Sequence, residues 1–356
     1  MTKEELQQLE IRCPSEEIKK QVQANWDAVA KPLDGLGAFE VLIAKIGAAL
    51  GTADFDLTKK AVIVMCADNG IVAEGVSQSG QDVTRRVAQS IARGEANVNL
   101  MAQAVSADVF CVDMGMAERV PDARIIECSP GHGTGNIACG SAMTREEAEC
   151  AVAQGKTLVQ TMKQRGYRMI ATGEMGIGNT TTSAAVASVL LGVDPSNIVG
   201  RGAGLSDSGL ARKLMTIRRA LMMNQPRADD PLDVLRKVGG YDLAGMMGIF
   251  LGGATEHVPV LADGMISCTA ALLAERLCPG TRDYVLPSHQ TREPAGKLVL
   301  DALGLQPVLH GDMALGEGTG AVMLLPLLDM ALRVYHGAHT FDALSMTAYT
   351  PQEDKG

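Results

Sequence analysis

The chain has 356 residues, of which 46% are hydrophobic and 3% aromatic, and its formal net charge is −9. This length and apolar content suffice for one large domain plus a smaller one, or for two of ordinary size, built on an aliphatic, methionine-rich core. Because phosphate backbones require a clustered basic face, the acidic balance argues against nucleic-acid binding, although a small anionic ligand needs only a few local donors.

Cysteine and histidine spacing offers no metal site. The eight cysteines contain no C-x-x-C pair, and the six histidines show neither H-x-H nor H-x-x-x-H spacing. Cys66 and Cys111 lie in apolar runs, where reduced, buried thiols are expected. The chain opens on a polar segment and has no apolar run of the roughly 20 residues that a membrane helix needs. We therefore expect a cytoplasmic protein with no metal, no cofactor and no membrane partner.

The first part of the chain is predicted to be helical from Thr2 to about Ala30, with a break at Lys31 and Pro32. Short apolar runs rich in β-branched residues then alternate with helical stretches, and strands without polar alternation suit a parallel sheet covered on both faces. The predicted strands span residues 61–67, 107–113, 168–172, 257–262, 284–287 and 306–310.

This alternation predicts a three-layer, Rossmann-like α/β fold. Residues 41–334 are predicted to form the catalytic domain. Residues 1–40 are predicted to be a helical accessory segment that packs with the C-terminal helices, about residues 335–356.

Helix signals fit between the strands. Thr144 and Glu147 form a capping box, which predicts a helix running to about Gln164. Another helix is predicted to begin near Ser206 or Ser208, and a last one near Glu317.

Ligands of open parallel sheets bind beyond the carboxyl ends of the strands, so the loops there are the candidate sites. The first carries Asp68 and Asn69, which are equally compatible with binding a sugar hydroxyl and with plain turn formation. His132 and His289 lie in two further loops of this kind and are candidate polar contacts to a ligand.

The loop from Thr172 to Ser183 carries three glycines, three consecutive threonines and the carboxylate of Glu174. Its Asn179–Thr182 segment would place amides and hydroxyls at a helix N-terminus, where the dipole favours a phosphate. The glycines are also compatible with tight packing of a helix on the sheet. The combination favours a binding site, with Glu174 within reach of the ligand.

Two more glycine-rich loops precede helices. Residues 200–207 could supply a second set of amides, with Lys213 one to two turns into the following helix, although a basic helix face is usually only solvated. Glu317 stands between Gly316 and Gly318, which would leave its carboxylate accessible to a ligand. A favourable charge near a helix dipole would also explain a glutamate there, but the flanking glycines favour a general base.

These loops carry a resemblance to a known family. The motifs A-D-N-G, G-E-M-G-I-G-N-T-T, G-R-G-A-G, K-V-G-G-Y-D, P-S-H and L-G-E-G-T-G occur here in that family's order, from about residue 30 to 335. The chain resembles the nicotinate-nucleotide:dimethylbenzimidazole phosphoribosyltransferases. The resemblance implies a reaction of nicotinate mononucleotide with 5,6-dimethylbenzimidazole that gives α-ribazole phosphate and nicotinate, and it implies a homodimer.

The resemblance also implies roles for individual residues. Glu317 would be the general base, and Glu174 and Lys213 would lie near the ribosyl and base sites. The substrate-binding residues implied are Gly176, Gly178, Asn179, Thr180, Thr181, Gly202 and Gly204 at the phosphate, and Ser79, Met175 and Leu315 at the benzimidazole.

The segment Ser77–Thr84 departs from better-known members of the family. Gly80 follows Ser79, where those members often have a proline, and Val87 follows two arginines at the start of the next helix. The alternative is therefore a phosphoribosyltransferase for another base, such as a different benzimidazole, adenine or a phenol. A nucleotide-sensing module without turnover is the non-enzymatic alternative.

Overall fold

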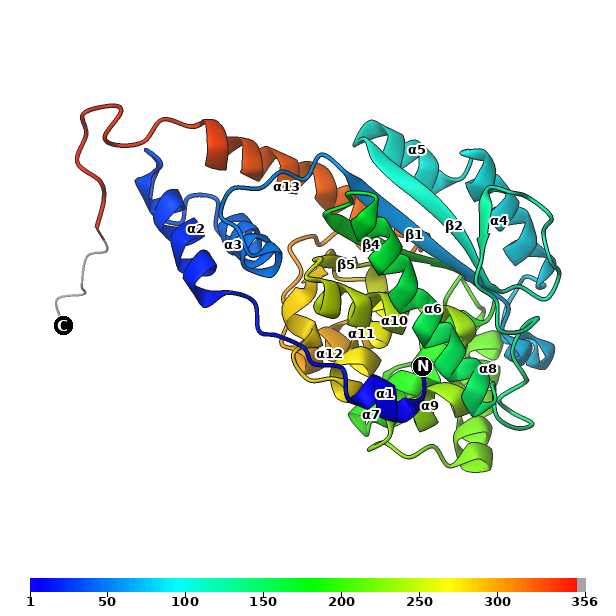
Figure 1. Ribbon diagram of the computed structural model, residues 1–356. Coiled ribbons are helices and arrows are strands. Elements are labelled where there is room, and N and C mark those ends of the chain that lie inside the picture. The colour runs from blue at the N-terminus through cyan, green and yellow to red at the C-terminus, as the bar shows by residue number, and fades with distance from the viewer. Residues whose placement is uncertain (351–356) are drawn as a thin grey trace.

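The computed structural model describes residues 1–350, which form a sheet covered by helices on both faces (Figure 1). All six strands run parallel, in the order β3-β2-β1-β4-β5-β6. The strands are β1 (Lys60–Ala67), β2 (Ala107–Gly115), β3 (Ile125–Glu127), β4 (Met169–Met175), β5 (Val260–Ala262) and β6 (Val285–Pro287). The predicted α/β class with a parallel sheet is confirmed.

The α-helices follow the strands as crossovers or extend the chain at its two ends. They are α1 (Lys3–Gln7), α2 (Glu16–Ala28), α3 (Ala38–Leu50), α4 (Asp82–Arg93), α5 (Asn97–Ala104), α6 (Arg145–Gln164), α7 (Asn179–Leu191), α8 (Asp207–Asn224), α9 (Pro231–Val238), α10 (Tyr241–Glu256), α11 (Gly264–Leu277), α12 (Ala295–Leu303) and α13 (Thr319–Gly337). Among residues 1–350, none of them is long and apolar enough to cross a membrane.

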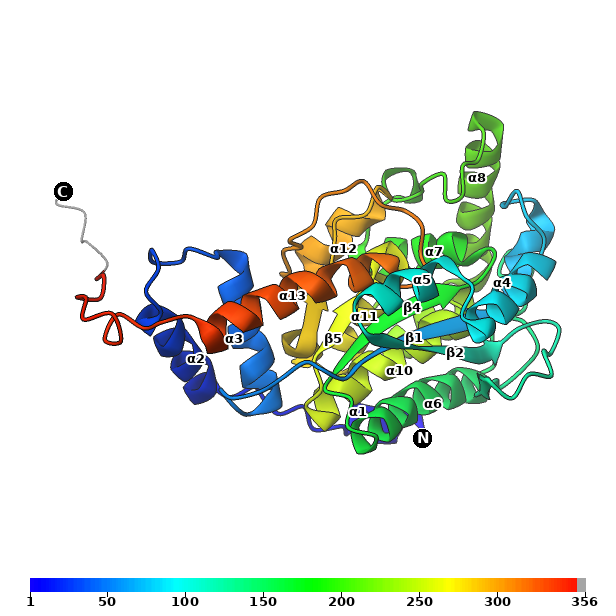
Figure 2. The same cartoon turned by 90° about the horizontal axis from the view of Figure 1, so that it is seen from above.

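The central strand β1 is buried along its whole length because its side chains enter two different cores. Ile63 and Met65 pack on one face with α6, α10 and α11, whereas Val62 and Val64 pack on the other with α4 and α13. Figure 2 shows α4, α5 and α13 along one side of the sheet and α6 and α10 along the other. This double burial explains why the strand has no polar alternation.

Two details of the predicted elements are wrong. Residues 306–310 form no strand, and Leu309 makes only an isolated bridge to His289. The predicted N-terminal helix is interrupted between α1 and α2, where Pro14 precedes the N-cap residue Ser15. A proline cannot donate the backbone hydrogen bond that a continuous helix would need.

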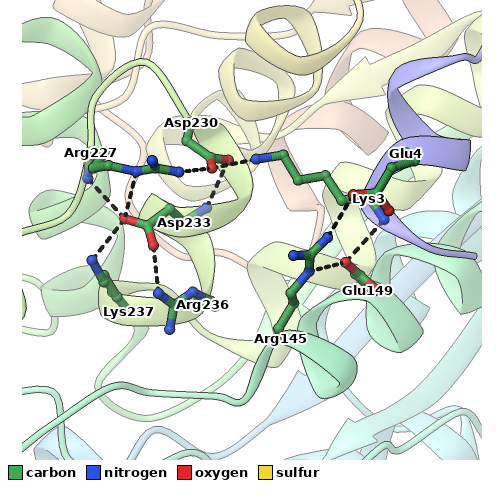
Figure 3. Close-up of polar contacts among 9 residues, drawn as sticks. All are labelled: Lys3, Glu4, Arg145, Glu149, Arg227, Asp230, Asp233, Arg236 and Lys237. Atoms are coloured by element: carbon green, nitrogen blue, oxygen red, sulfur yellow. Dashed lines mark hydrogen bonds and ion pairs between the residues drawn. The ribbon is translucent and has the colours of Figure 1, made fainter.

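The N-terminal arm, residues 1–15, is fastened to α6 and α9 by a network of ion pairs (Figure 3). Lys3 pairs with Asp230, and the Arg145 guanidinium contacts Glu4 at 3.1 Å and Glu149 at 2.7 Å. Leu6 of this arm is completely buried. The arm therefore belongs to the packed structure even though α1 is only a short helix.

Beyond the arm, α2 and α3 pack together, and α3 packs against α13. Val29 forms a bridge with Thr340, which brings the segment after α2 beside the segment after α13. The division of the chain near residue 40 into an accessory and a catalytic part stays a proposal. Residues 351–356 of the predicted accessory part lie outside the described residues.

Candidate active site

A pocket of about 240 Å³ lies at the carboxyl edge of the sheet. Its walls come from the loops after β4, β5 and β6, from the segment before α13 and from Gly202 and Ala203. These are the loops in which a parallel sheet is expected to hold its ligand.

Glu317 lies on one wall in a left-handed backbone conformation, with φ of 60°. Gly316 and Gly318 on either side also have positive φ, at 87° and 89°. Such a conformation costs a non-glycine residue roughly 1–2 kcal/mol, and strain of this kind concentrates at functional sites. The carboxylate accepts a hydrogen bond of 3.1 Å from the Val98 amide and one of 3.4 Å from the Asn97 side chain, both at the N-terminus of α5.

Asp263 fixes the backbone around Glu317. Its carboxylate accepts the amides of Gly318, Gly320 and Ala321 at 3.1, 2.8 and 3.1 Å, and so caps the first turn of α13. Burial raises the pKa of this carboxyl group to about 7. Asp263 follows β5 directly, so its position after a strand was a signal that could have marked it as a site residue.

Glu174 stands near the end of β4 and accepts a hydrogen bond from the Asn179 side chain. Burial, and secondly the charge of Asp242, raises the pKa of Glu174 to about 8. Asp242 is itself completely buried, and burial raises its pKa to about 6. At neutral pH the Glu174 carboxyl group is therefore mostly protonated and can donate a hydrogen bond to a ligand. Glu317 lines the same pocket.

The pocket wall also carries hydrogen-bond donors. Asn179 and Thr180 form the first turn of α7, whose N-cap is Gly178 with φ of 95°. Lys213 is completely buried behind this turn, and its ammonium group donates to the Thr180 hydroxyl at 2.9 Å and to the Gly200 carbonyl at 3.2 Å. Burial lowers the pKa of Lys213 to about 8. A cation and a helix N-terminus together favour an anionic ligand here.

Most of the residues predicted for the site line this pocket. Those are Glu317, Glu174, Gly176, Asn179, Thr180, Gly202, Met175 and Leu315.

The others lie outside the pocket lining. Lys213 and Thr181 are completely buried, and Gly178 packs closely against the loop of Val72. Gly204 accepts a hydrogen bond from the Gln78 side chain, and Ser79 is half-buried on the same segment as Gln78. These residues can act on a ligand only through their neighbours or after a movement of the loops.

The Ser77–Thr84 segment lies beside the pocket rim. The Thr84 hydroxyl accepts the Ile177 amide at 3.2 Å, and the Gln78 side chain contacts the loop at Gly204. No residue of this segment is among the described residues that line the pocket. It therefore supports the pocket walls in this structure.

Asp68 and Asn69 connect loops within the protein. Asp68 accepts the Ala117 amide at 2.8 Å, and the Asn69 side chain accepts the Thr182 hydroxyl at 3.2 Å. Both residues are buried and absent from the pocket wall, which favours their interpretation as structural turn residues.

Three polar residues of the pocket lie in the loop after β6: His289, Thr291 and Glu293. Only His289 was singled out in the sequence, as a candidate polar contact. Glu293 accepts the Gly202 amide at 3.0 Å, a contact between loops 91 residues apart that no local pattern could indicate. Within residues 1–350, no group of three or more His, Cys, Asp or Glu side chains could hold a metal ion.

Comparisons of this chain with family models, with other sequences and with solved structures all indicate the same family. Residues 11–345 match a family described as phosphoribosyltransferase. Nicotinate-nucleotide–dimethylbenzimidazole phosphoribosyltransferase from Acetivibrio thermocellus is 44% identical over 93% of this chain and 94% of its own. The enzyme of the same name from Ruminiclostridium cellulolyticum is 41% identical over 95% of this chain and 96% of its own. The crystal structure of CobT from Thermus thermophilus superimposes with a TM-score of 0.89 at 40% identity, over 94% of this chain and 100% of that one.

Proposed function

The chain belongs to the nicotinate-nucleotide–dimethylbenzimidazole phosphoribosyltransferase family, and we propose that it transfers the phosphoribosyl group of nicotinate mononucleotide to 5,6-dimethylbenzimidazole. The products are α-ribazole 5′-phosphate, which supplies the lower ligand of cobalamin, and nicotinate. The observation that carries this proposal is that Glu317 lines the same pocket as the N-terminus of α7, which is suited to a phosphate.

Glu317 acts as the general base. Nicotinate leaves readily from a quaternary pyridinium nucleotide, so the step that needs help is loss of the benzimidazole ring proton as the other ring nitrogen attacks C1′. A fixed carboxylate within hydrogen-bond reach of that proton meets this need. The Val98 amide and the Asp263 cap hold the side chain and its backbone in place, so little reorganisation is required.

The phosphate binds at the first turn of α7 and at Gly202. Thr180 contacts it directly, whereas Lys213 acts through the Thr180 hydroxyl and through its charge. Lys213 is therefore a positioning residue in this proposal. The protonated carboxyl group of Glu174 donates a hydrogen bond to the ribosyl group.

The aromatic acceptor lies against an apolar wall. Met175, Met265, Ile266, Met313 and Leu315 all line the pocket, and methionine side chains adapt to flat aromatic rings of different outline. This adaptability also keeps the alternative open, in which another benzimidazole, adenine or a phenol is the acceptor.

Two further properties are part of the proposal. The family resemblance supports a homodimer, which light scattering of the purified protein would test. The free cysteines, including buried Cys66 and Cys111, support a reducing, cytoplasmic location, which fractionation of the producing cell would test.

Incubation of the protein with nicotinate mononucleotide and dimethylbenzimidazole tests the reaction. We expect a product with the mass of ribazole phosphate, in the α-anomeric form, because attack opposite to nicotinate inverts the anomeric carbon. Hydrolysis of nicotinate mononucleotide to nicotinate, without formation of this product, would contradict the proposal.

A further inference from the structure

His289 lines the pocket but takes no part in the proposed proton transfer or phosphate binding. It follows β6, is almost completely buried and lines the pocket beside Asp263. Its ring lies between two glycines, since a Cβ atom at Gly320 would stand 2.0 Å from Nδ1 and one at Gly264 would stand 3.6 Å from Nε2. The ring is therefore held in one place by its surroundings.

The neighbours of His289 determine which ring nitrogen carries the proton. The Ser288 hydroxyl donates its only proton to the Ala262 carbonyl oxygen at 2.7 Å. The same hydroxyl oxygen lies 3.0 Å from Nδ1 of His289, so in that contact it can only accept a hydrogen bond. The Asp263 carboxylate, 3.8 Å from Nδ1, favours the same arrangement. Nδ1 therefore carries the proton.

Nε2 is then the ring atom left for a ligand. None of the polar contacts of the described residues involves Nε2, although the ring lines the pocket. Burial lowers the pKa of His289, so the imidazole is neutral at pH 7. In the neutral ring with a protonated Nδ1, Nε2 is an acceptor without a proton and needs a donor from the ligand.

The substrates of the proposed reaction offer few such donors. In nicotinate mononucleotide the ring carboxylate accepts hydrogen bonds, and so does the phosphate dianion. Its only strong donors are the two ribose hydroxyl groups. The single N–H of the benzimidazole is the proton that Glu317 takes.

We propose that Nε2 of His289 accepts a hydrogen bond from a ribose hydroxyl group of the nucleotide and so fixes the sugar in the pocket. This inference rests on the proposed function, because the donors are those of its nucleotide substrate. His289 would then select ribose nucleotides over deoxyribose nucleotides.

Two substitutions separate the ring nitrogens. In His289→Asn the short side chain can retain a hydrogen bond at the Nδ1 position but does not reach the Nε2 position. In His289→Gln the amide oxygen reaches the Nε2 position and can accept the same hydrogen bond. Thermal unfolding of both variants shows whether the pocket loop stays folded.

The experiment measures kcat/KM of each protein with nicotinate mononucleotide and with its 2′-deoxy and 3′-deoxy forms. We expect one deoxy form to lose about 10- to 100-fold with the wild-type protein and with His289→Gln. With His289→Asn the parent nucleotide should lose a similar factor, while the same deoxy form should lose less than about threefold.

Three results would overturn the inference. They are equal use of all three nucleotides by the wild-type protein, an equal loss with all three in His289→Asn, and a change confined to the KM of the benzimidazole. Calorimetric titration with the same three nucleotides gives a readout independent of turnover. A wild-type protein that binds the ribose form more tightly but makes no ribazole phosphate would refute the proposed reaction and leave the role of His289 standing.

Discussion

The backbone amide of Glu317 donates a hydrogen bond of 3.2 Å to the carbonyl oxygen of Glu174. Glu174 and Glu317, two of the acidic residues that line the pocket, are therefore joined through their main chains, at the point where β4 passes the N-terminus of α13. Gly173 makes this approach possible, because a Cβ atom there would lie 2.4 Å from the Glu317 carbonyl oxygen.

Gly173→Ala should therefore displace Glu317 and lower kcat by at least tenfold, since small misplacements of a reacting group cost large factors in rate. Gly140→Ala is the matched control, because a Cβ atom at Gly140 would meet nothing within 4 Å. Steady-state kinetics of both variants would check this. Equal activity of the two variants would show that the contact does not position the base.

Glu174 should make stability depend on pH. Its pKa of about 8 in the folded protein exceeds the ordinary value of 4.5, so between these values the folded state binds more protons than the unfolded state. Stability must then fall as pH rises from about 4 to about 8, by a few kcal/mol at most from this group. Glu174→Gln removes this contribution.

Urea unfolding at pH 5 and pH 8 would measure the effect. Glu174→Gln should be more stable than the wild-type protein at pH 8 and closer to it at pH 5. The exposed Glu10 provides the control substitution Glu10→Gln, which should leave the pH dependence unchanged. A pH dependence in Glu174→Gln equal to that of the wild-type protein would mean that Glu174 is ionised in the folded state.

The sequence indicated where the site lies because its signals are local. Apolar runs marked five of the six strands, and glycines next to Glu174 and Glu317 marked the loops at their ends. The short strand β3, only Ile125–Glu127, escaped notice because three residues make no recognisable pattern.

Other features of the site depend on contacts between distant segments. The cap by Asp263 joins the loop after β5 to α13, and the support of Glu317 by Asn97 joins α5 to the segment before α13. Lys213 on α8 is buried where it meets Thr180 of α7 and Gly200. Glycines in the loop from Thr172 to Ser183 pack closely against other parts of the protein. Gly173 lies against Glu317, and Gly178 lies against Val72. Glycine content alone cannot distinguish such packing from room for a ligand.

Thr180 and Thr181 should differ in their effect on nucleotide binding. Thr180 lines the pocket and carries the hydrogen bond from Lys213, whereas the Thr181 hydroxyl is buried and has no partner among the described residues. Thr180→Val should weaken binding of nicotinate mononucleotide by roughly 1.5–3 kcal/mol, the cost of a hydrogen bond to a charged group. Calorimetric titration should show little change in affinity for Thr181→Val. Equal losses in both variants would place the phosphate elsewhere.

Acceptor choice should be permissive. The pocket wall of Met175, Met313 and Leu315 is apolar, and one methyl group is worth only about 1–3 kcal/mol of discrimination. Unsubstituted and mono-substituted benzimidazoles should therefore react within roughly a hundredfold of the dimethyl compound. Adenine should be worse, because its exocyclic amine would lie unpaired against apolar side chains.

Competition between pairs of acceptors in one reaction would measure this preference directly. Gly80 is exposed, and Arg85 is paired with Glu118 at 3.1 Å, so neither narrows the pocket in this structure. Preference for adenine or a phenol over every benzimidazole would refute both the apolar wall as the acceptor site and the named substrate.

The most direct test of the proposed reaction is the turnover of Glu317→Gln. Glutamine keeps the length of the side chain and can still accept the Val98 amide, but it cannot take a proton from the benzimidazole. Rates of α-ribazole phosphate formation at saturating substrates should fall by about two to four orders of magnitude, while calorimetric affinity for nicotinate mononucleotide stays the same. Turnover close to that of the wild-type protein would contradict the role of Glu317 as the general base.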